Sequence, residues 1–197
     1  VAIKLKNRRH VAHPIPTVNY LLVCEHTHVY TMGKCGDSAH LLASPETLQA
    51  QGIAFQRTNR GGDMTYHGPG QLVVYPVLDL ENFFIDIHRY LRLLEEAVIA
   101  TLQDFGLTAG RIPGLTGVWL HAEDRSKASK LCAIGVRASR WVTMHGLALN
   151  VNTDLSYFNH IIPCGLPDQS VTSMTVALGT QQDLLAVAKS LEQHLAQ

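Results

Sequence analysis

Short apolar and polar blocks follow one another along the chain, and their spacing predicts a mixture of strands and helices. Tyr20–Cys24 and Val29–Met32 are β-favouring runs, and Leu72–Leu78 is the nearly continuous apolar run typical of a strand buried on both faces. Further strand-like runs lie at 53–57, 118–120, 130–137, 141–144 and 146–152. The last three are closely spaced, which indicates a β-meander.

Helical spacing is clearest in residues 86–105, where apolar side chains recur every three or four positions until Gly106 ends the pattern. A shorter helix is predicted after Ser44, a suitable N-cap residue. The last helix is expected to begin at Thr180, with Asp183 completing a capping box. Because strands and helices mix without a repeating strand-helix-strand order, the sequence predicts an α+β (mixed α/β) fold with a mainly antiparallel sheet flanked by helices.

Four stretches show neither the pattern of a strand nor the three- or four-residue spacing of a helix. Residues 1–18 are basic and contain two prolines, and the chain opens without an initiator Met, so we expect an N-terminal arm that is incomplete. Residues 111–117 are interpreted as a Pro/Gly loop and residues 121–129 as a charged, solvated hairpin tip. Residues 154–169 are irregular and rich in Pro and Gly.

Length and composition limit the possible classes of protein. The 197 residues suit a single catalytic domain spanning 1–197, and the 46% hydrophobic and 16% charged residues indicate a compact globular chain. Lys plus Arg equals Asp plus Glu, 16 against 16, so no overall field favours nucleic acid or an anionic membrane as a partner. No apolar run is long enough to span a bilayer, and we expect a soluble monomer.

The cysteine pattern favours reduced thiols. Cys24, Cys35, Cys132 and Cys164 include no CxxC pair, and their density is far below that of a secreted disulfide scaffold. A cytoplasmic protein is therefore expected, or a protein of the mitochondrial matrix if the source is eukaryotic.

Residues 60–71 contain four glycines and a proline together with several polar side chains. Glycine allows backbone conformations that a Cβ would forbid, so this stretch could lie close against a ligand. A Gly-rich connector between two strands has the same composition, and composition alone does not separate the two interpretations.

Cys164 lies between prolines in an irregular stretch, which is an unusual setting for a core cysteine and suggests a nucleophile; a small apolar filler is the alternative. A thiol with a pKa of about 8.5 needs a base or a nearby cation to react well at neutral pH. Lys130, His67 and His145 are the candidate helpers. Lys130 could be a buried base or a strand-end lysine that reaches solvent, and Cys132, placed on the same strand face, is interpreted as packing.

The histidines His26 and His28 invite a metal hypothesis. Catalytic zinc sites place two histidines four residues apart on a helix with a Glu between them, whereas these two have strand spacing and no evident third ligand. No metal is therefore expected.

Four ordered motifs resemble those of the lipoyl(octanoyl) transferases of lipoate biosynthesis, and the similarity extends from about Asn19 to Met174. They are the glycine-rich stretch RGGDMTYHGPGQ at 60–71, KLCAIGV at 130–136, HGLALN at 145–150 and IPCG at 162–165. The resemblance implies the fold shared with biotin and lipoate protein ligases. It also implies transfer of an octanoyl or lipoyl group from acyl carrier protein to a specific lysine of lipoyl domains, which occur in 2-oxoacid dehydrogenase complexes and the glycine cleavage H protein.

The same resemblance assigns roles to residues. Cys164 would carry the acyl group as a thioester and Lys130 would act on its thiol, as a cation or as a neutral base. The thioester is already activated, so no ATP or other cofactor is expected. The resemblance places acyl-chain contacts at Arg60, Gly61, Gly62, Asp63, Met64, Thr65, Tyr66, His67, Ala133, Ile134, Gly135, Gly146, Leu147 and Ala148.

The chain departs from the commonest pattern of that family at Asp63, where glutamine is frequent, and in the long hairpin tip at 122–129. Neither departure predicts inactivity. Two rival hypotheses are an ATP-dependent lipoate or biotin protein ligase of the same fold and a non-catalytic binder of acyl carrier protein or lipoyl domains. The chain retains both the Cys and the Lys that such a binder would be expected to lose.

Overall fold

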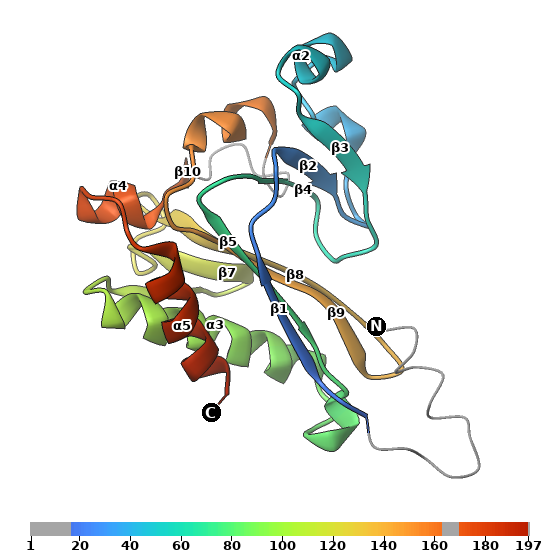
Figure 1. Cartoon of the computed structure of the whole chain (residues 1–197), viewed down its shortest axis with the longest axis vertical. Coiled ribbons are helices and arrows are strands. Elements are labelled where there is room, and N and C mark those ends of the chain that lie inside the picture. The colour runs from blue at the N-terminus through green and yellow to red at the C-terminus, as the bar shows by residue number, and fades with distance from the viewer. Residues whose placement is uncertain (1–16, 163–169, 197) are drawn as a thin grey trace.

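The computed structural model of the chain describes residues 17–162 and 170–196 (Figure 1). Residues 1–16 of the expected N-terminal arm lie outside the described residues. Pro163, Cys164 and Gly165, the last three residues of the IPCG motif, lie outside them as well. The described part is an α+β structure built on two sheets, as predicted. No helix within it is both long and apolar enough to cross a membrane.

The main sheet is antiparallel between all successive neighbours along its path. Its strands, in spatial order, are β1 (Tyr20–Cys24), β5 (Gln71–Val77), β9 (Val142–Asn150), β8 (Ser129–Ser139), β7 (Leu115–Leu120) and β6 (Ala109–Ile112). The short β10 (Ser170–Val171) adds a parallel pairing to β8.

Two helices, α3 (Ile87–Asp104) and α5 (Leu184–Leu195), pack against each other on one face of this sheet (Figure 1). Asp86 caps α3 by accepting hydrogen bonds from the backbone N–H groups of His88 and Arg89. The apolar stripe of α3, including Val98 and Leu102, packs on the inward-facing side chains of the central strands. Truncating Leu102 to Ala should destabilise the fold by about 2–5 kcal/mol, since its side chain is fully buried.

A second, smaller sheet lies on the side of the main sheet opposite α3 and α5 (Figure 1). Its central strand is β2 (Val29–Met32), which pairs parallel with β3 (Ala54–Arg57) and antiparallel with β4 (Met64–His67). Tyr30 and Tyr66 are at the centre of a separate apolar cluster beneath it. The short helix α2 (Pro45–Ala50) precedes β3 and is capped by Ser44, as predicted.

Some predicted boundaries were wrong. The glycine-rich stretch contains strand β4, and the expected Pro/Gly loop at 111–117 is occupied by the end of β6, a tight turn and the start of β7. The two runs at 141–144 and 146–152 form the single strand β9.

The last helix also begins later than predicted. Asp183 is its N-cap and accepts a hydrogen bond from the backbone N–H of Leu185, so α5 starts at Leu184 and Thr180 lies before the cap. A short helix, α4 (Met174–Leu178), was not predicted; Ser173 caps it and Gly179 ends it in the left-handed conformation. Three 3-10 helices complete the description, at Ser38–His40, Leu80–Asn82 and Leu155–His160.

Candidate active site

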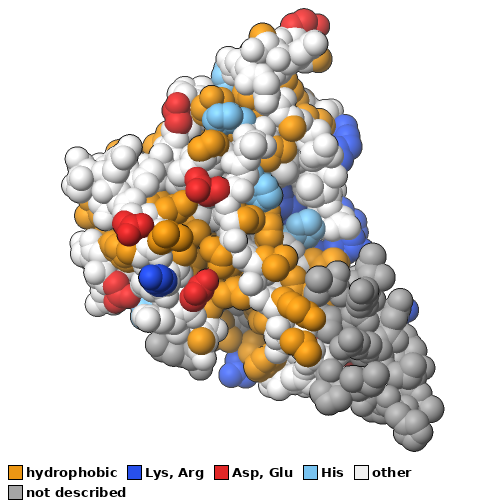
Figure 2. Space-filling view, viewed as in Figure 1, with side chains coloured by type: hydrophobic (Ala, Val, Ile, Leu, Met, Phe, Trp, Pro, Cys, Tyr) orange, Lys and Arg blue, Asp and Glu red, His pale blue; other side chains and the backbone are white. Residues whose placement is uncertain are grey.

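A pocket lies between the small sheet and the face of the main sheet that points away from α3 and α5. On β5, Leu72 and Val74 belong to the core under the helices, whereas Val73 and Tyr75 line the pocket, as strand alternation requires. Its empty space is about 680 Å³ including the open mouth. Histidine and basic side chains gather in Figure 2 where the two sheets meet.

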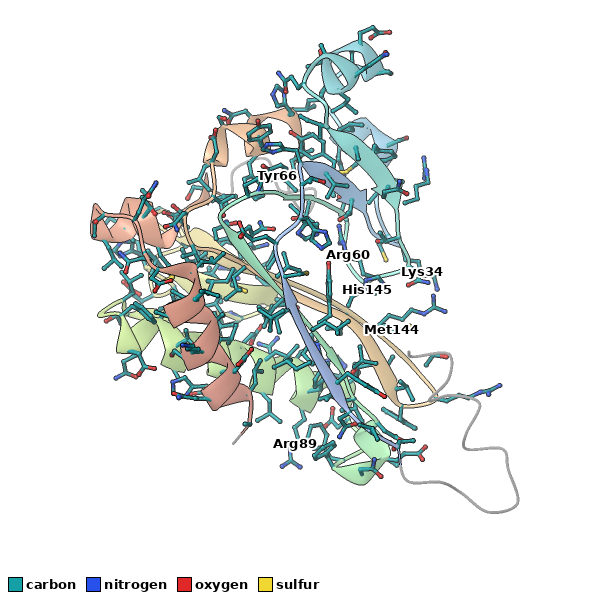
Figure 3. The ribbon with its side chains drawn as sticks, in the orientation of Figure 1. Lys34, Arg60, Tyr66, Arg89, Met144 and His145 are labelled. Carbon is teal, nitrogen blue, oxygen red and sulfur yellow. The ribbon has the colours of Figure 1, made fainter. Side chains whose placement is uncertain are left out.

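Arg60 fixes the shape of the glycine-rich stretch. Its buried guanidinium donates to the carbonyl oxygens of Thr31 (2.7 Å), Asp63 (2.8 Å) and Gly61 (3.0 Å) and to the Thr31 hydroxyl (3.0 Å). These bonds tie the stretch to β2, and Figure 3 shows Arg60 near His145, where the small sheet meets β9. A cation is thereby built into the pocket wall with its donors directed at backbone carbonyls.

The carboxylate of Asp63 has a defined role. It accepts a hydrogen bond from the backbone N–H of Asp37 (3.1 Å) and forms a close side-chain hydrogen bond with Nδ1 of His40. The backbone of His40 in turn accepts a hydrogen bond from the N–H of Ile162 (2.8 Å). Asp63 therefore connects the pocket wall to the backbone segment that ends two residues before Cys164 in the sequence.

Two glycines allow close backbone approaches at the pocket, one between β8 and the glycine-rich stretch and one between β9 and β5. A Cβ on Gly135 would lie 2.9 Å from the carbonyl oxygen of Gly61, and one on Gly146 would lie 2.0 Å from that of Val74. Both contacts are with backbone, which cannot move aside cheaply. The glycine-rich stretch is further attached to β8 through the hydrogen bond from the Gly61 N–H to Val136 (2.9 Å).

A chain of side-chain hydrogen bonds fixes the tautomer of His67. Asn150 donates to the carbonyl of Thr172 (3.0 Å), and the Gln71 amide donates to Asn150 (2.8 Å) and to the Tyr66 carbonyl (3.2 Å). The oxygen of Gln71 must then accept from Nδ1–H of His67 (2.8 Å), so in the neutral ring Nε2 carries the lone pair.

Burial is the main cause of the low basicity of both pocket histidines. It lowers the pKa of His67 to about 4, helped by the positive charge of Arg60 and opposed by the bond to Gln71. Burial also lowers the pKa of His145, again with Arg60 and then Arg137 contributing. Both rings are consequently neutral at physiological pH, so an acyl chain in this pocket would meet uncharged imidazoles.

Lys130 lines the same pocket and is 7% exposed. The expectation that Cys132 shares its strand face was wrong, because a register shift between β7 and β8 separates them. Cys132 is fully buried in the core under the helices, as its interpretation as packing required, and burial strongly raises its pKa.

Cys164 lies outside the described residues, but the segments on either side of it are attached to the site. Upstream, Ile161 bridges to Leu41, and Ile162 is bonded to His40. Downstream, Val171 pairs with Lys130, and the N–H of Thr172 donates to the Lys130 carbonyl (3.0 Å).

The pocket brings together most of the residues named from the sequence. All the predicted acyl-chain residues line it except Tyr66, whose fully buried side chain packs in the small-sheet cluster and whose hydroxyl pairs with His28 (2.7 Å). Both helper histidines and Lys130 line it as well. Sequence reasoning missed Thr31, Thr58, Val73, Tyr75 and Thr116, which come from strands and loops outside the motifs.

His26 and His28, the candidate metal ligands, have other partners. His26 pairs with the Tyr75 hydroxyl (2.7 Å), and His28 stacks on Tyr157 with ring centroids 4.4 Å apart. Within residues 17–162 and 170–196, no group of three or more His, Cys, Asp or Glu side chains is arranged to hold a metal ion.

The model of the lipoyl protein ligase A/B catalytic domain matches residues 5–196 of this chain. The chain belongs to this family. An octanoyltransferase of Flavobacterium johnsoniae is 60% identical over 182 residues, covering 92% of this chain and 78% of that protein. An octanoyltransferase of Christiangramia forsetii is 58% identical over 195 residues, covering 98% of this chain and 82% of its own length.

Solved structures of lipoate protein ligases share the fold at low identity. The bipartite lipoate protein ligase of Thermoplasma acidophilum superposes with a TM-score of 0.73 and 20% identity, covering 99% of this chain and 76% of that one. Lipoate-protein ligase A, solved with ATP, gives a TM-score of 0.71 at 20% identity, covering 90% of this chain and 71% of that one. The predicted ligase-like α+β fold is thereby confirmed.

Proposed function

We propose that this member of the family is an octanoyltransferase that moves an octanoyl or lipoyl group from acyl carrier protein to a lysine of a lipoyl domain, through a thioester on Cys164. The relatives of 58–60% identity carry the name octanoyltransferase, whereas the ligases share only the fold at 20% identity. The observation that carries the proposal is that Lys130 lines one pocket together with all the predicted acyl-chain residues except Tyr66.

In the first step the Cys164 thiolate attacks the carbonyl carbon of the donor thioester. A new C–S bond forms, the bond to the carrier thiol breaks, and that thiol leaves with a proton. Lys130 acts on the Cys164 thiol. This pairing is supported by the downstream flank of residues 163–169, which pairs with Lys130, and by the upstream flank, which is hydrogen-bonded to His40, a partner of Asp63 in the pocket wall.

In the second step the acceptor lysine attacks the enzyme thioester as a neutral amine. A C–N bond forms, the C–S bond to Cys164 breaks so that Cys164 leaves as thiolate, and the nitrogen releases one proton to solvent; the amide product is more stable than either thioester. The neutral imidazoles of His67 and His145 keep the pocket compatible with an acyl chain, while its glycines expose backbone to the carbonyl oxygen. Carrier protein and lipoyl domain would be met in a bacterial cytoplasm or a mitochondrial matrix.

Incubation with octanoyl carrier protein, with and without ATP, tests the function. Without nucleotide, intact-mass analysis should show one octanoyl adduct, which peptide mapping places on Cys164 and which is absent from Cys164→Ala. Cys35→Ala is the matched control, since Cys35 is an exposed free thiol outside the pocket. If no adduct forms and acylation of a lipoyl domain requires ATP, the ligase hypothesis is correct instead.

A further inference from the structure

Trp119 lies directly against the catalytic lysine of the transfer reaction proposed above. The two residues face each other across β7 and β8, and Nζ of Lys130 is 4.6 Å from the centroid of the Trp119 ring. Trp119 is 1% exposed and Lys130 7% exposed, so the contact is largely removed from water. We propose that Trp119 is a positioning residue for Lys130: its indole face holds the side-chain nitrogen at the pocket wall and keeps it in the ammonium form.

The local backbone is built for this contact. Val118 pairs with Cys132 and Trp119 pairs with Lys130, so the register shift lies at this pair. Val118 belongs to the core under the helices, and strand alternation turns Trp119 to the other face of the sheet, toward Lys130. Gly117, with φ +125°, completes the arrangement: a Cβ there would lie 2.7 Å from the Cys132 carbonyl oxygen and 3.6 Å from Cε of Lys130.

Charge is the reason that this contact matters. Burial disfavours an ammonium group, whereas the negative face of an aromatic ring attracts it, and the attraction is strongest when water is excluded. The buried carboxylate of Glu95 lies nearby on the helix side of β7. It is bound by Arg92 (2.9 Å), by Arg111 (2.9 Å) and by the N–H of Gly117 (3.0 Å). The other titratable side chains that line the pocket with Lys130 are Arg60, Asp63, His67, Tyr75 and His145.

An ammonium fixed in this way acts on Cys164 through its charge. It stabilises the thiolate, the thiol proton is released to solvent, and Lys130 keeps its own proton through the attack on the donor thioester. Trp119 touches neither the acyl group nor the thiol in this scheme, and its effect passes through Lys130.

Fluorinated tryptophan tests the charge effect with almost no change of shape. The chain has two tryptophans and six lysines, so Trp141→Phe confines the label to Trp119, and Lys130→Arg assigns the Lys130 signal in the NMR spectrum of protein labelled with carbon-13 at lysine Cε. Each added fluorine reduces the negative electrostatic potential on the face of the indole ring. The titration midpoint of Lys130 should therefore move stepwise to lower pH, by about one pH unit in total. A midpoint that does not change with fluorination overturns the proposal.

Substitution separates positioning from general packing. Trp119→Leu should slow formation of the Cys164 octanoyl adduct about tenfold, and Trp119→Phe should restore most of the rate because it keeps an aromatic face. The indole Nε1 has no hydrogen-bond partner among the described residues, so Phe leaves no described acceptor unpaired. In Lys130→Met, Trp119→Leu should have no further effect on the rate of Cys164 alkylation; an equal effect there would mean that Trp119 only supports the fold.

The NMR titration needs no acyl donor. A wild-type protein that takes no octanoyl group from carrier protein would therefore refute the proposed function while leaving the Trp119–Lys130 result readable.

Discussion

Lowering the pH from about 7.5 to about 5 should destabilise the wild-type protein more than a His67→Asn variant. Folding lowers the pKa of His67 from 6.5 to about 4, chiefly through burial. The unfolded chain then binds more protons than the folded one as the pH falls through this window. The resulting penalty is absent above the unfolded pKa, grows as the pH falls and is complete below the folded pKa.

The size of the effect follows from the shift. A difference of about 2.5 pKa units corresponds to roughly 3 kcal/mol when complete, and about two thirds of that is reached by about pH 5. Solvent reaches part of the ring, so we expect wild type to lose about 1–2 kcal/mol more than the variant over this range.

Urea unfolding of both proteins at the two pH values measures this difference. Asn places its amide nitrogen where His67 has Nδ1, so the donation to Gln71 is retained while the titrating group is removed. All other titrating groups are common to both proteins and cancel in the comparison. Identical pH dependence in the two proteins would show that His67 is not held neutral by the fold, and the description of the pocket as uncharged at the imidazoles would fail.

Other substitutions test the packing around the site. Gly146→Ala should lower the free energy of unfolding by several kcal/mol, because its Cβ would lie 2.0 Å from a β5 carbonyl oxygen. Gly114→Ala, at φ +83° with open space around the Cβ, should lower it by only about 1 kcal/mol, and thermal unfolding of both variants checks this. Glu95→Ala should destabilise by about 3 kcal/mol in urea, since it removes a fully buried carboxylate from two arginines, while Lys127→Ala breaks an exposed pair and should change stability by less than about 1 kcal/mol. Asp63→Ala should increase amide hydrogen exchange at residues 37–41 and leave exchange in α3 unchanged. If exchange at 37–41 is the same in the variant as in wild type, Asp63 does not hold this segment to the pocket wall.

Elements with a long, regular pattern could be predicted from the sequence. The helix α3 has an amphipathic stripe over 18 residues and a capping Asp86, and both features are local. The strand β5 was predicted for the same reason, since its apolar run needs no knowledge of its partners. These segments carry enough information within themselves to fix their type.

Features that depend on distant partners were missed or misplaced. The strand β4 is four residues long and is defined by pairing with β2, far upstream. In β9, His145 has φ 61°, so the strand pattern is interrupted at the residue where two separate runs were predicted. Asp183, predicted as the last residue of a capping box that begins at Thr180, is itself the N-cap of α5, and this choice depends on the tertiary structure.

The residues of the candidate site that lie within the motifs could be predicted from the sequence, and the others could not. Thr31 and Tyr75 reach the pocket from strands with no motif of their own, and only the pairing of the sheets brings them there. The interaction of Asp63 with His40 joins the glycine-rich stretch to a segment outside the motifs, and nothing in the local sequence of either segment indicates this contact. The register shift between β7 and β8 interrupts the alternation of strand faces, so Cys132 and Lys130 do not share a face. The same shift brings the Trp119 ring against Lys130.

A pulse-chase experiment tests the central claim most directly. Enzyme treated with octanoyl carrier protein is freed of carrier and then mixed with a lipoyl domain that lacks its acyl group, without ATP. The octanoyl group should leave Cys164 and appear as an amide on one lysine of the domain, at a rate that at least equals the overall turnover. If the Cys164 adduct persists, and the domain is acylated only when carrier protein is added back, transfer does not pass through this thioester.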